Sequence, residues 1–421
     1  MLLAMAQLQA ETTTNSAPAL AGETITRPSP AMLSAADAQS FLKVPGITDE
    51  QIKAVLASGS GISGPGKLVI GKGWGGFFDG RREDGTSGHT AVTDQNRAKT
   101  ASGASVTEHL IPSIRPIWDI HMRDTVICRG GDGFYYMTGS TGENIWMYND
   151  GVEIYRSADL QKWEYLGLVW SIEKDGVAWE KTWRNDHKRA RPIRAIWAPE
   201  LHYIHKNYYL CISMPDAGIA ILKSATGKPE GPYVHAAGAQ KALVNSIDPT
   251  LFEDDDGAVY FTCHGADTIA RMKDDLSDFA EPPRPVTLLH TDHDPARHSK
   301  VFCKRTNYQD LGFEGATLFK ANGIYFLGVT DLVDGHYTMC LATSKSIHGP
   351  YEGRQCPVPG NGGTGFFQDK AGHWFTSYFG DDTMAPWRSK PGILRVDISA
   401  DGKVTIAKDQ PDFILAPSSA E

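Results

Sequence analysis

The chain has 421 residues, 41% of them hydrophobic, which is enough for a packed core in one large domain or two ordinary ones. Its 50 acidic and 41 basic residues leave a net charge of −9 with no long basic run, which argues against nucleic acid and anionic membranes as partners. A neutral or weakly charged substrate fits this charge better. No stretch approaches the ~18 to 20 apolar residues of a membrane span.

Residues 1–30 contain the run LLAMAQLQA, followed by a stretch rich in Ser, Thr, Ala and Pro. This composition is typical either of a shortened export signal or of a plain disordered leader. The first alternative predicts a periplasmic or secreted protein.

Residues 31–62 are expected to form a small helical segment. The run TDEQIKAVLAS places Thr48 three residues before Gln51, the spacing of a capping box, ahead of an apolar stripe at Ile52, Val55 and Leu56. Residues 63–110 are rich in Gly, Ser and Thr, carry no phosphate-loop spacing and are expected to form loops.

The cysteines are few for this length and include no C-x-x-C pair, which argues against a zinc ribbon. Four of them lie inside apolar, strand-like runs, so buried free thiols are favoured over disulfides. They are Cys128, Cys211, Cys263, Cys303, Cys340 and Cys356.

From residue 111 onward, one pattern recurs five times: a strand, a turn with Gly or Asn, and an aromatic strand. Further strands after most of these hairpins would complete four-stranded units. Residues 111–421 are therefore predicted to form an all-β, five-bladed β-propeller, in which each blade buries its faces against its neighbours. The five segments are RDTVICRGGDGFYYMTGS, WAPELHYIHKNYYLCIS, DPTLFEDDDGAVYFTCHG, EGATLFKANGIYFLGVT and GGTGFFQDKAGHWFTSYF, with turn residues Gly133, Asn207, Gly257, Gly323 and Gly372.

Nine residues before each turn residue lies one equivalent position per blade: Asp124, Ala198, Asp248, Glu314 and Gly363. The first strand of a propeller blade lines the central channel, so these positions should ring one end of the axis. Three of the five are carboxylates, which would repel one another in a shared pocket. Because such repulsion costs stability, a catalytic use is favoured over a structural one.

Glycoside hydrolysis is the chemistry that fits three gathered carboxylates. It needs one carboxylic acid to protonate the leaving oxygen and one carboxylate to activate water or attack carbon. A third carboxylate can raise the pKa of the acid and keep it protonated near neutrality.

The ordered motifs RDTVI, WAPELHYIHKNYYL, SIDPTLFEDDDG and FEGATLF resemble glycoside hydrolase family 43 over about residues 115–385. This resemblance implies that Asp124 is the general base, Asp248 the pKa modulator and orienting residue, and Glu314 the general acid. It also implies inversion, with a base-to-acid separation of ~6.5 to 9.5 Å. The implied substrates are arabinofuranosides, xylosides or galactofuranosides of plant or algal polysaccharides.

The sequence departs from that family in two places. Blade 1 has Asp-Thr where Asp-Pro is commoner, and Asp119 in PIWDIHM is a rival base that lies out of register. The blade 5 run GNGGTGFFQD lacks the His that helps many members hold an axial metal. An axial calcium is therefore not expected, and no cofactor is predicted.

Several further side chains are candidates for contact with substrate. Trp118 and Trp197 could stack on a sugar face or pack in the core, and His264 and His336 follow strands where they could touch hydroxyls. Glu200 is expected to have a structural or supporting role. The group His290, Asp292, His293, Asp294 and His298 matches no defensible metal spacing and is expected to be a polar loop.

Two other functions stay open. Family 117 of the same clan cleaves 3,6-anhydro-L-galactose from agar oligomers, has an N-terminal helical segment used in dimerisation, and is thought to use a His as acid. That alternative predicts a homodimer through residues 31–62, but Glu314 in register speaks against it. A non-catalytic sugar-binding propeller is the other alternative, although a lectin has no need of three carboxylates.

Overall fold

The structure is a computed structural model that describes residue 43 and residues 46–57, 114–118, 120–142, 145–186, 191–238, 241–289, 311–333, 336–379 and 389–415. The leader (1–30), the loop region (63–110), Asp119, Cys303 and the His290–His298 group lie outside the described residues. Of the predicted helical segment, the part around residues 46–57 is described.

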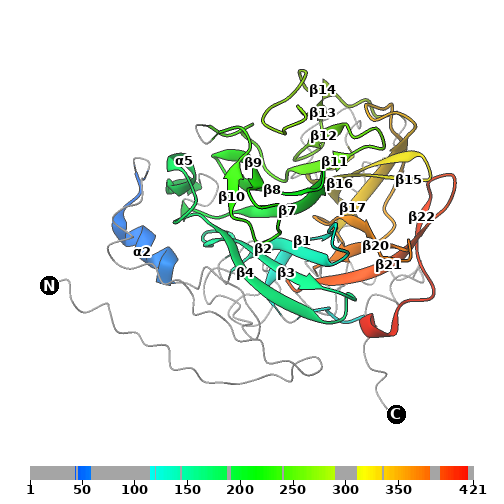
Figure 1. Cartoon of the computed structure of the whole chain (residues 1–421), viewed down its shortest axis with the longest axis horizontal. Helices are drawn as coiled ribbons and strands as arrows, with labels where there is room; N and C mark the ends of the chain where they lie inside the picture. The colour runs from blue at the N-terminus through cyan, green and yellow to red at the C-terminus, as the bar shows by residue number, and fades with distance from the viewer. Residues whose placement is uncertain are drawn as a thin grey trace, which may run out of the picture.

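Five four-stranded antiparallel sheets form the body of the molecule, and each is built from four consecutive strands. They follow one another around a common centre in chain order (Figure 1). The prediction of an all-β, five-bladed propeller is therefore confirmed. The strands are β1 (Met122–Arg129), β2 (Tyr135–Thr141), β3 (Gly151–Ser157) and β4 (Trp163–Ser171); β7 (Trp197–Ile204), β8 (Asn207–Met214), β9 (Gly218–Ser224) and β10 (Tyr233–His235); β11 (Thr250–Glu253), β12 (Val259–Thr262), β13 (Thr268–Arg271) and β14 (Arg284–Pro285); β15 (Glu314–Ala321), β16 (Ile324–Val333), β17 (His336–Ser344) and β18 (Glu352–Gln355); and β19 (Phe366–Gln368), β20 (Trp374–Tyr378), β21 (Gly392–Ile398) and β22 (Val404–Ile406).

Left-handed turn residues close the first hairpin of each blade. Four of the five predicted turn residues are glycines with positive φ: Gly133, Gly257, Gly323 and Gly372. The prediction is wrong at Asn207, which opens β8 instead. The two-residue turn there consists of His205 (φ 49°) and Lys206 (φ 60°), because a turn of this length needs two left-handed residues to match the strand twist.

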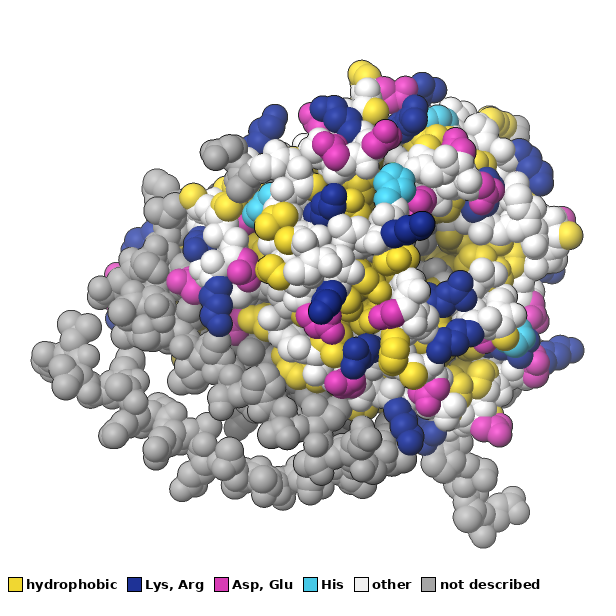
Figure 2. Space-filling model, in the orientation of Figure 1, with side chains coloured by type: hydrophobic (Ala, Val, Ile, Leu, Met, Phe, Trp, Pro, Cys, Tyr) yellow, Lys and Arg dark blue, Asp and Glu magenta, His cyan; other side chains and the backbone are white. Residues whose placement is uncertain are grey.

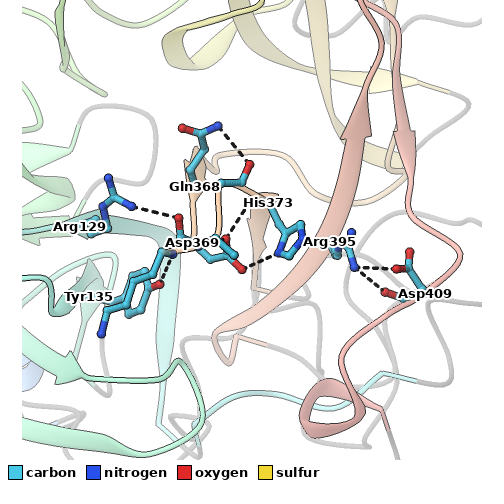
Figure 3. Close-up of polar contacts among 10 residues, drawn as sticks. Arg129, Tyr135, Gln368, Asp369, His373, Arg395 and Asp409 are labelled. Atoms are coloured by element: carbon cyan, nitrogen blue, oxygen red, sulfur yellow. Dashed lines mark hydrogen bonds and ion pairs between the residues drawn. The ribbon is translucent and has the colours of Figure 1, made fainter.

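Blade 5 closes the ring by packing against blade 1 on one side and blade 4 on the other. Figure 3 shows the blade 5 hairpin loop beside blade 1, where Arg129 donates from Nη1 to the carbonyl oxygen of Asp369 at 3.0 Å. The backbone N–H of Lys370 donates to the Tyr135 hydroxyl at 2.8 Å. On the other side, the ring of Phe319 in β15 stacks on that of Phe366 in β19, with centroids 4.6 Å apart.

The two ends of the described propeller also meet. Ile114 forms an antiparallel bridge with Leu415, and the N–H of Arg115 donates to the carbonyl oxygen of Ile414 at 2.8 Å. The chain therefore enters the first blade beside the segment in which the last blade ends. That last segment contains the short 3-10 helix η3 (Asp412–Ile414).

The helix α2 (Asp49–Ala57) covers the outside of the propeller. Its capping box is confirmed, because Thr48 N–H donates to Gln51 Oε1 at 2.9 Å and Gln51 N–H donates to Thr48 Oγ1 at 3.2 Å. The buried Ile52 and Val55 pack in a cluster with Trp183 and its neighbours, so the apolar stripe is used within the chain. Near this cluster lie α5 (Ala178–Lys181), β5 (Arg184–Asp186) and β6 (Arg191–Ile193).

Within the described residues, no helix has the length and apolar character needed to cross a membrane. Figure 2 shows acidic and basic side chains interspersed over one face of the molecule rather than gathered by sign. This mixed surface agrees with the modest net charge of the chain.

The five cysteines that the structure describes are free thiols, as predicted. Cys340 and Cys356 lie close together, with their sulfur atoms 2.8 Å apart at the β17–β18 edge of blade 4. The other three thiols belong to different strands or blades: Cys128, Cys211 and Cys263.

We expect a disulfide donor such as oxidised glutathione to join Cys340 to Cys356 before any other pair. The two thiols lose two protons and two electrons, and the donor is reduced to two thiols. Peptide mapping by mass spectrometry without reductant would identify the bond, and the apparent melting temperature should rise by a few degrees because a loop of about 15 residues is closed. Cys356→Ser is the control, and cross-linking of a different pair would contradict the expectation.

Candidate active site

A left-handed residue marks the start of the inner strand in every blade. The five residues are Asp124 (φ 52°), Ala198 (φ 41°), Asp248 (φ 53°), Gly315 (φ 70°) and Gly363 (φ 65°). Three of them lack the conformational freedom of glycine, so the fold must hold them there, at a cost of order 1 kcal/mol each. Because inner strands of neighbouring blades contact one another, these kinks lie around one end of the ring.

Glu314 does not lie at the left-handed position of its blade, although its nine-residue spacing from the turn residue suggests that it does. It pairs across its hairpin with Thr330, as Arg123 pairs with Ser140, so it precedes the kink by one residue. Residues at equal distances from their turn residues are not structurally equivalent here, because the hairpin loops differ in length. Blade 4 turns in two residues, whereas blade 1 uses the five residues 130–134.

Asp124 is held between blades 1 and 2 by a serine. The hydroxyl of Ser140 donates to Asp124 Oδ2 at 2.6 Å. The hydroxyl oxygen of Ser140 in turn accepts from the N–H of Ala198 at 2.7 Å. Gly363 of blade 5 adjoins the other carboxyl oxygen, since a methyl group at that glycine would lie 2.9 Å from Asp124 Oδ1. Residues of three blades therefore position this one carboxylate.

Asp248 is half-buried and accepts a hydrogen bond at Oδ2 from the N–H of Gly315 at 2.8 Å. Burial raises its pKa well above the ordinary value, and the nearby charges of Glu314 and Asp124 raise it further. The Gly315 N–H acts in the opposite direction but does not cancel these effects. The three carboxyl groups are thus close enough for the charges of Asp124 and Glu314 to act on Asp248.

Glu314 is half-buried and accepts a hydrogen bond at Oε1 from the Tyr337 hydroxyl at 2.9 Å. A buried ion pair supports the segment just before it, because Arg354 donates to Asp331 Oδ2 at 2.8 Å and to the carbonyl oxygen of Leu311 at 3.2 Å. The backbone that leads into Glu314 is therefore anchored within its own blade.

Aromatic rings and one arginine pack beside the carboxylates. Arg123 and Phe379 are buried, whereas Trp146, Trp197 and Tyr337 are half-buried. The guanidinium of Arg123 lies 4.4 Å from the Trp146 ring and 4.8 Å from the Phe379 ring. Trp146 in turn contacts Trp197 edge-on at 5.4 Å, and Tyr337 contacts Phe379 at 6.4 Å. This aromatic wall, which comprises Arg123, Trp146, Trp197, Tyr337 and Phe379, runs through four blades and suits the apolar face of a sugar.

The predicted substrate contacts differ in where the structure places them. Trp197 is half-buried at the start of β7 and belongs to the aromatic wall. Trp118 packs against the hydrophobic core between blades 1 and 5, which favours its alternative role in the core. His264 is exposed, and its N–H donates to the carbonyl oxygen of Asp248 at 3.3 Å; His336 opens β17, but its side chain is outside the described residues.

Glu200 is buried and forms an ion pair with His202, with Nε2 and Oε2 2.9 Å apart. The backbone N of Leu251, in the strand that follows Asp248, lies 3.4 Å from the same ring nitrogen. This linkage between blades 2 and 3 fits the supporting role expected for Glu200.

Sequence reasoning missed several of these groups, namely Arg123, Ser140, Trp146, Gly315, Tyr337 and Phe379. Some were within reach, because Arg123 and Gly315 directly adjoin the candidate carboxylates in the chain. Ser140 and Tyr337 come from the second and third strands of their blades, where no spacing pattern pointed to the axis.

The described residues contain no group of three or more His, Cys, Asp or Glu arranged to hold a metal ion. In the blade 5 run, the Asn361 amide is already used, since its oxygen accepts from Met339 N–H at 3.3 Å and its nitrogen donates to Thr376 Oγ1 at 3.3 Å. The Asn361 side chain is therefore held in place by two neighbouring strands.

The family model "Glycosyl hydrolases family 43" matches residues 114–404, which run from the start of the described propeller to the first residue of β22 in blade 5. The chain belongs to this family. The match begins at the residue where the described propeller begins, and the family resemblance expected from the motifs is confirmed.

Among curated relatives of this family 43 protein, the extracellular exo-alpha-(1->5)-L-arabinofuranosidase ArbA of Cellvibrio japonicus is 26% identical over 257 residues, covering 55% of this chain and 66% of the relative. A putative beta-xylosidase of Xylanibacter ruminicola is 24% identical, with 60% of this chain and 46% of the relative covered. The chain thus spans less than two thirds of the length of these relatives.

Solved structures share the fold. A thermostable family-43 glycoside hydrolase superposes with a TM-score of 0.53 at 18% identity, over 73% of this chain and all of that one. An endo-arabinase from Bacteroides thetaiotaomicron superposes with a TM-score of 0.51 at 19% identity, over 69% of this chain and 99% of the other.

Replacing Asp248 by Asn should stabilise the protein at neutral pH. The raised pKa means that ionised Asp248 costs stability, and that this cost grows as the pH rises above the ordinary value of 3.8. We expect Asp248→Asn to gain about 1 to 2 kcal/mol at neutral pH, roughly the value of one pKa unit, and the gain to vanish near pH 3.8.

Chemical denaturation of both proteins across this pH range would measure the effect. Asp397→Asn is the matched control, since Asp397 is an exposed aspartate of β21. A lower stability of Asp248→Asn at neutral pH would show that the carboxylate is stabilised rather than strained.

Proposed function

We propose that the protein is an inverting glycoside hydrolase, with Asp124 as general base, Asp248 as modulator and orienting residue, and Glu314 as general acid. The observation that carries this proposal is that three carboxyl groups from blades 1, 3 and 4 lie close enough for the charges of Glu314 and Asp124 to raise the pKa of Asp248. A neutral binding protein has no need of a site that costs stability in this way.

The contacts around Asp124 suit a base that activates water. Ser140 donates to one carboxyl oxygen, which favours the ionised form and fixes the group. Gly363 carries no side chain beside the other oxygen, where a methyl group would approach to 2.9 Å. The lack of a side chain at Gly363 therefore keeps blade 5 from crowding Oδ1.

The separation of base and acid is consistent with inversion. A methyl group on Gly363 would lie 2.9 Å from Asp124 Oδ1 and 3.4 Å from the Tyr337 hydroxyl, which is itself 2.9 Å from Glu314 Oε1. Added end to end, these three lengths give an upper limit on the distance between Asp124 Oδ1 and Glu314 Oε1. This upper limit lies below the ~9.5 Å that inverting enzymes reach, so the two carboxyl groups are not too far apart for inversion.

The aromatic side chains beside the carboxylates and the names of related proteins support a class of substrate. The half-buried rings of Trp146 and Trp197 offer a surface for a neutral sugar. Relatives are named as an arabinofuranosidase, a beta-xylosidase and a beta-D-galactofuranosidase. We therefore place the substrate among arabinofuranosides, xylosides and galactofuranosides of plant or algal polysaccharides. Export to the periplasm or medium completes the proposal, supported by the composition of residues 1–30 and by the extracellular relative.

Inversion predicts the first product. When the active aryl glycoside or oligosaccharide is identified by screening, proton NMR at early times should show the anomer opposite to that of the substrate, before mutarotation mixes the two. First formation of the same anomer would replace the proposed mechanism by a double displacement.

One specific observation favours a second candidate, a family 117-like 3,6-anhydro-L-galactosidase with a histidine acid. His264 is exposed and its backbone is bonded to that of Asp248, so a histidine does lie beside the pocket. The family match and the contacts of Glu314 favour the first proposal. A homodimer through α2, which this alternative suggests, would have to use the exposed face of that helix.

Glu314→Gln separates the two candidates. If Glu314 is the acid, we expect a loss of 10²-fold or more in kcat on the native substrate, the usual share of general acid catalysis. His264→Ala is the matched control and should retain most activity. The opposite pattern would identify the histidine as the acid, and binding without any hydrolysis by the wild type would support a lectin.

A further inference from the structure

We propose that Tyr337 is the positioning residue of the general acid: its hydroxyl donates to Oε1 of Glu314 and so places the acidic proton on Oε2. This inference rests on the proposed function, because it assigns the two oxygens of Glu314 separate tasks. The single observation behind it is the 2.9 Å hydrogen bond from the tyrosine hydroxyl to Oε1.

The backbone around Tyr337 fixes where this hydroxyl lies. The N–H of Gly362 donates to the Tyr337 carbonyl oxygen at 2.9 Å, and a methyl group on Gly362 would lie only 2.5 Å from the tyrosine ring. The rings of Phe313 and Phe379 contact the tyrosine ring with centroids 6.3 and 6.4 Å away. The ring is thus held between blades 4 and 5, and the hydroxyl has little freedom to leave Glu314.

The environment of the Tyr337 hydroxyl favours its protonated form. Burial raises the Tyr337 pKa well above its usual value, and the charges of Glu314, Asp124 and Asp248 raise it further, while Arg123 lowers it. Tyr337 therefore remains a donor to Glu314 in both protonation states of that carboxyl group.

A protonated carboxyl group carries one O–H and one carbonyl oxygen, and the carbonyl oxygen is the better acceptor. Since Tyr337 donates to Oε1, the favoured arrangement has Oε1 as the carbonyl and the proton on Oε2. As Oε2 gives its proton to the leaving oxygen, negative charge spreads over both carboxyl oxygens. The bond from Tyr337 then becomes charge-assisted and stronger, so it favours the transition state over the ground state.

Tyr337→Phe should therefore weaken acid catalysis in a recognisable way. Loss of the donor destabilises the carboxylate, so the alkaline limb of the pH profile of kcat/KM should move up by about one pH unit. On glycosides with basic leaving groups we expect a loss of about tenfold to a hundredfold in kcat. On activated nitrophenyl glycosides, whose leaving group needs little protonation, the loss should be only a few-fold.

The measurement is the dependence of kcat on leaving-group pKa for a series of aryl glycosides, in the wild type, Tyr337→Phe, Glu314→Gln and the double variant. We expect a steeper dependence in each single variant and no further loss in the double variant. An equal loss on all leaving groups with an unmoved alkaline limb would show that Tyr337 is only structural. If Glu314→Gln itself shows no added leaving-group dependence, the assignment of Glu314 as acid fails first.

Fluorotyrosine incorporated at position 337 tests the same bond without removing it. The substituted phenol is a stronger donor on an unchanged ring, so the alkaline limb should move down, opposite to Tyr337→Phe. This readout serves if the phenylalanine variant does not fold, and an unmoved limb would overturn the proposal.

Discussion

Closure of the ring by blade 5 is the constraint on which the rest of the structure depends. No blade can bury both faces alone, so the last sheet must pack on the first. The carbonyl oxygen of Thr125 accepts from the Ser377 hydroxyl at this junction, next to the carboxylate of Asp124. The same junction places Gly363 against Asp124 Oδ1, so the contact that completes the fold also shapes the pocket.

Two features of the site reduce the stability of the protein locally, and the contacts of the closed ring offset them. Asp124, Ala198 and Asp248 adopt a left-handed backbone conformation, and aspartate tolerates it better than most side chains because its short polar group can bond locally. Burying like charges beside Asp248 adds an electrostatic cost. Both costs fall at one end of the ring. There the hydrogen bonds from Ala198 N–H to the Ser140 hydroxyl and from Gly315 N–H to Asp248 cross between blades and hold the strained residues in place.

The fold could be predicted from the sequence because hairpin patterns depend on local chemistry. Short apolar strands and left-handed turn glycines such as Gly257 and Gly372 can be recognised from neighbouring residues alone, without knowledge of the tertiary structure. The capping box of α2 is local in the same sense, with both of its hydrogen bonds confined to Thr48 and Gln51.

What the sequence could not show depends on the length of loops and on contacts between blades. Counting from the turn placed Glu314 in register, but a two-residue turn in blade 4 shifts it by one position. Tyr337 and Ser140 reach the pocket from second and third strands, and only the closed ring shows that they meet Glu314 and Asp124. Trp118 shows the converse, because a tryptophan close to the register position packs in the core.

The one-residue offset of Glu314 explains how equivalent positions can serve different chemistry. Where blades 1 and 3 place an aspartate on the kink, blade 4 has Gly315, whose backbone N–H donates to Asp248. A side chain at Gly315 would clash with the Thr330 hydroxyl, 2.7 Å from its first carbon, so an acid cannot occupy that position. The acid of blade 4 therefore comes from the preceding residue, and glutamate, one carbon longer than aspartate, extends it toward the same centre. Its different backbone position also gives it a different partner, Tyr337, so that carboxyl groups facing one pocket need not share one pKa or one role.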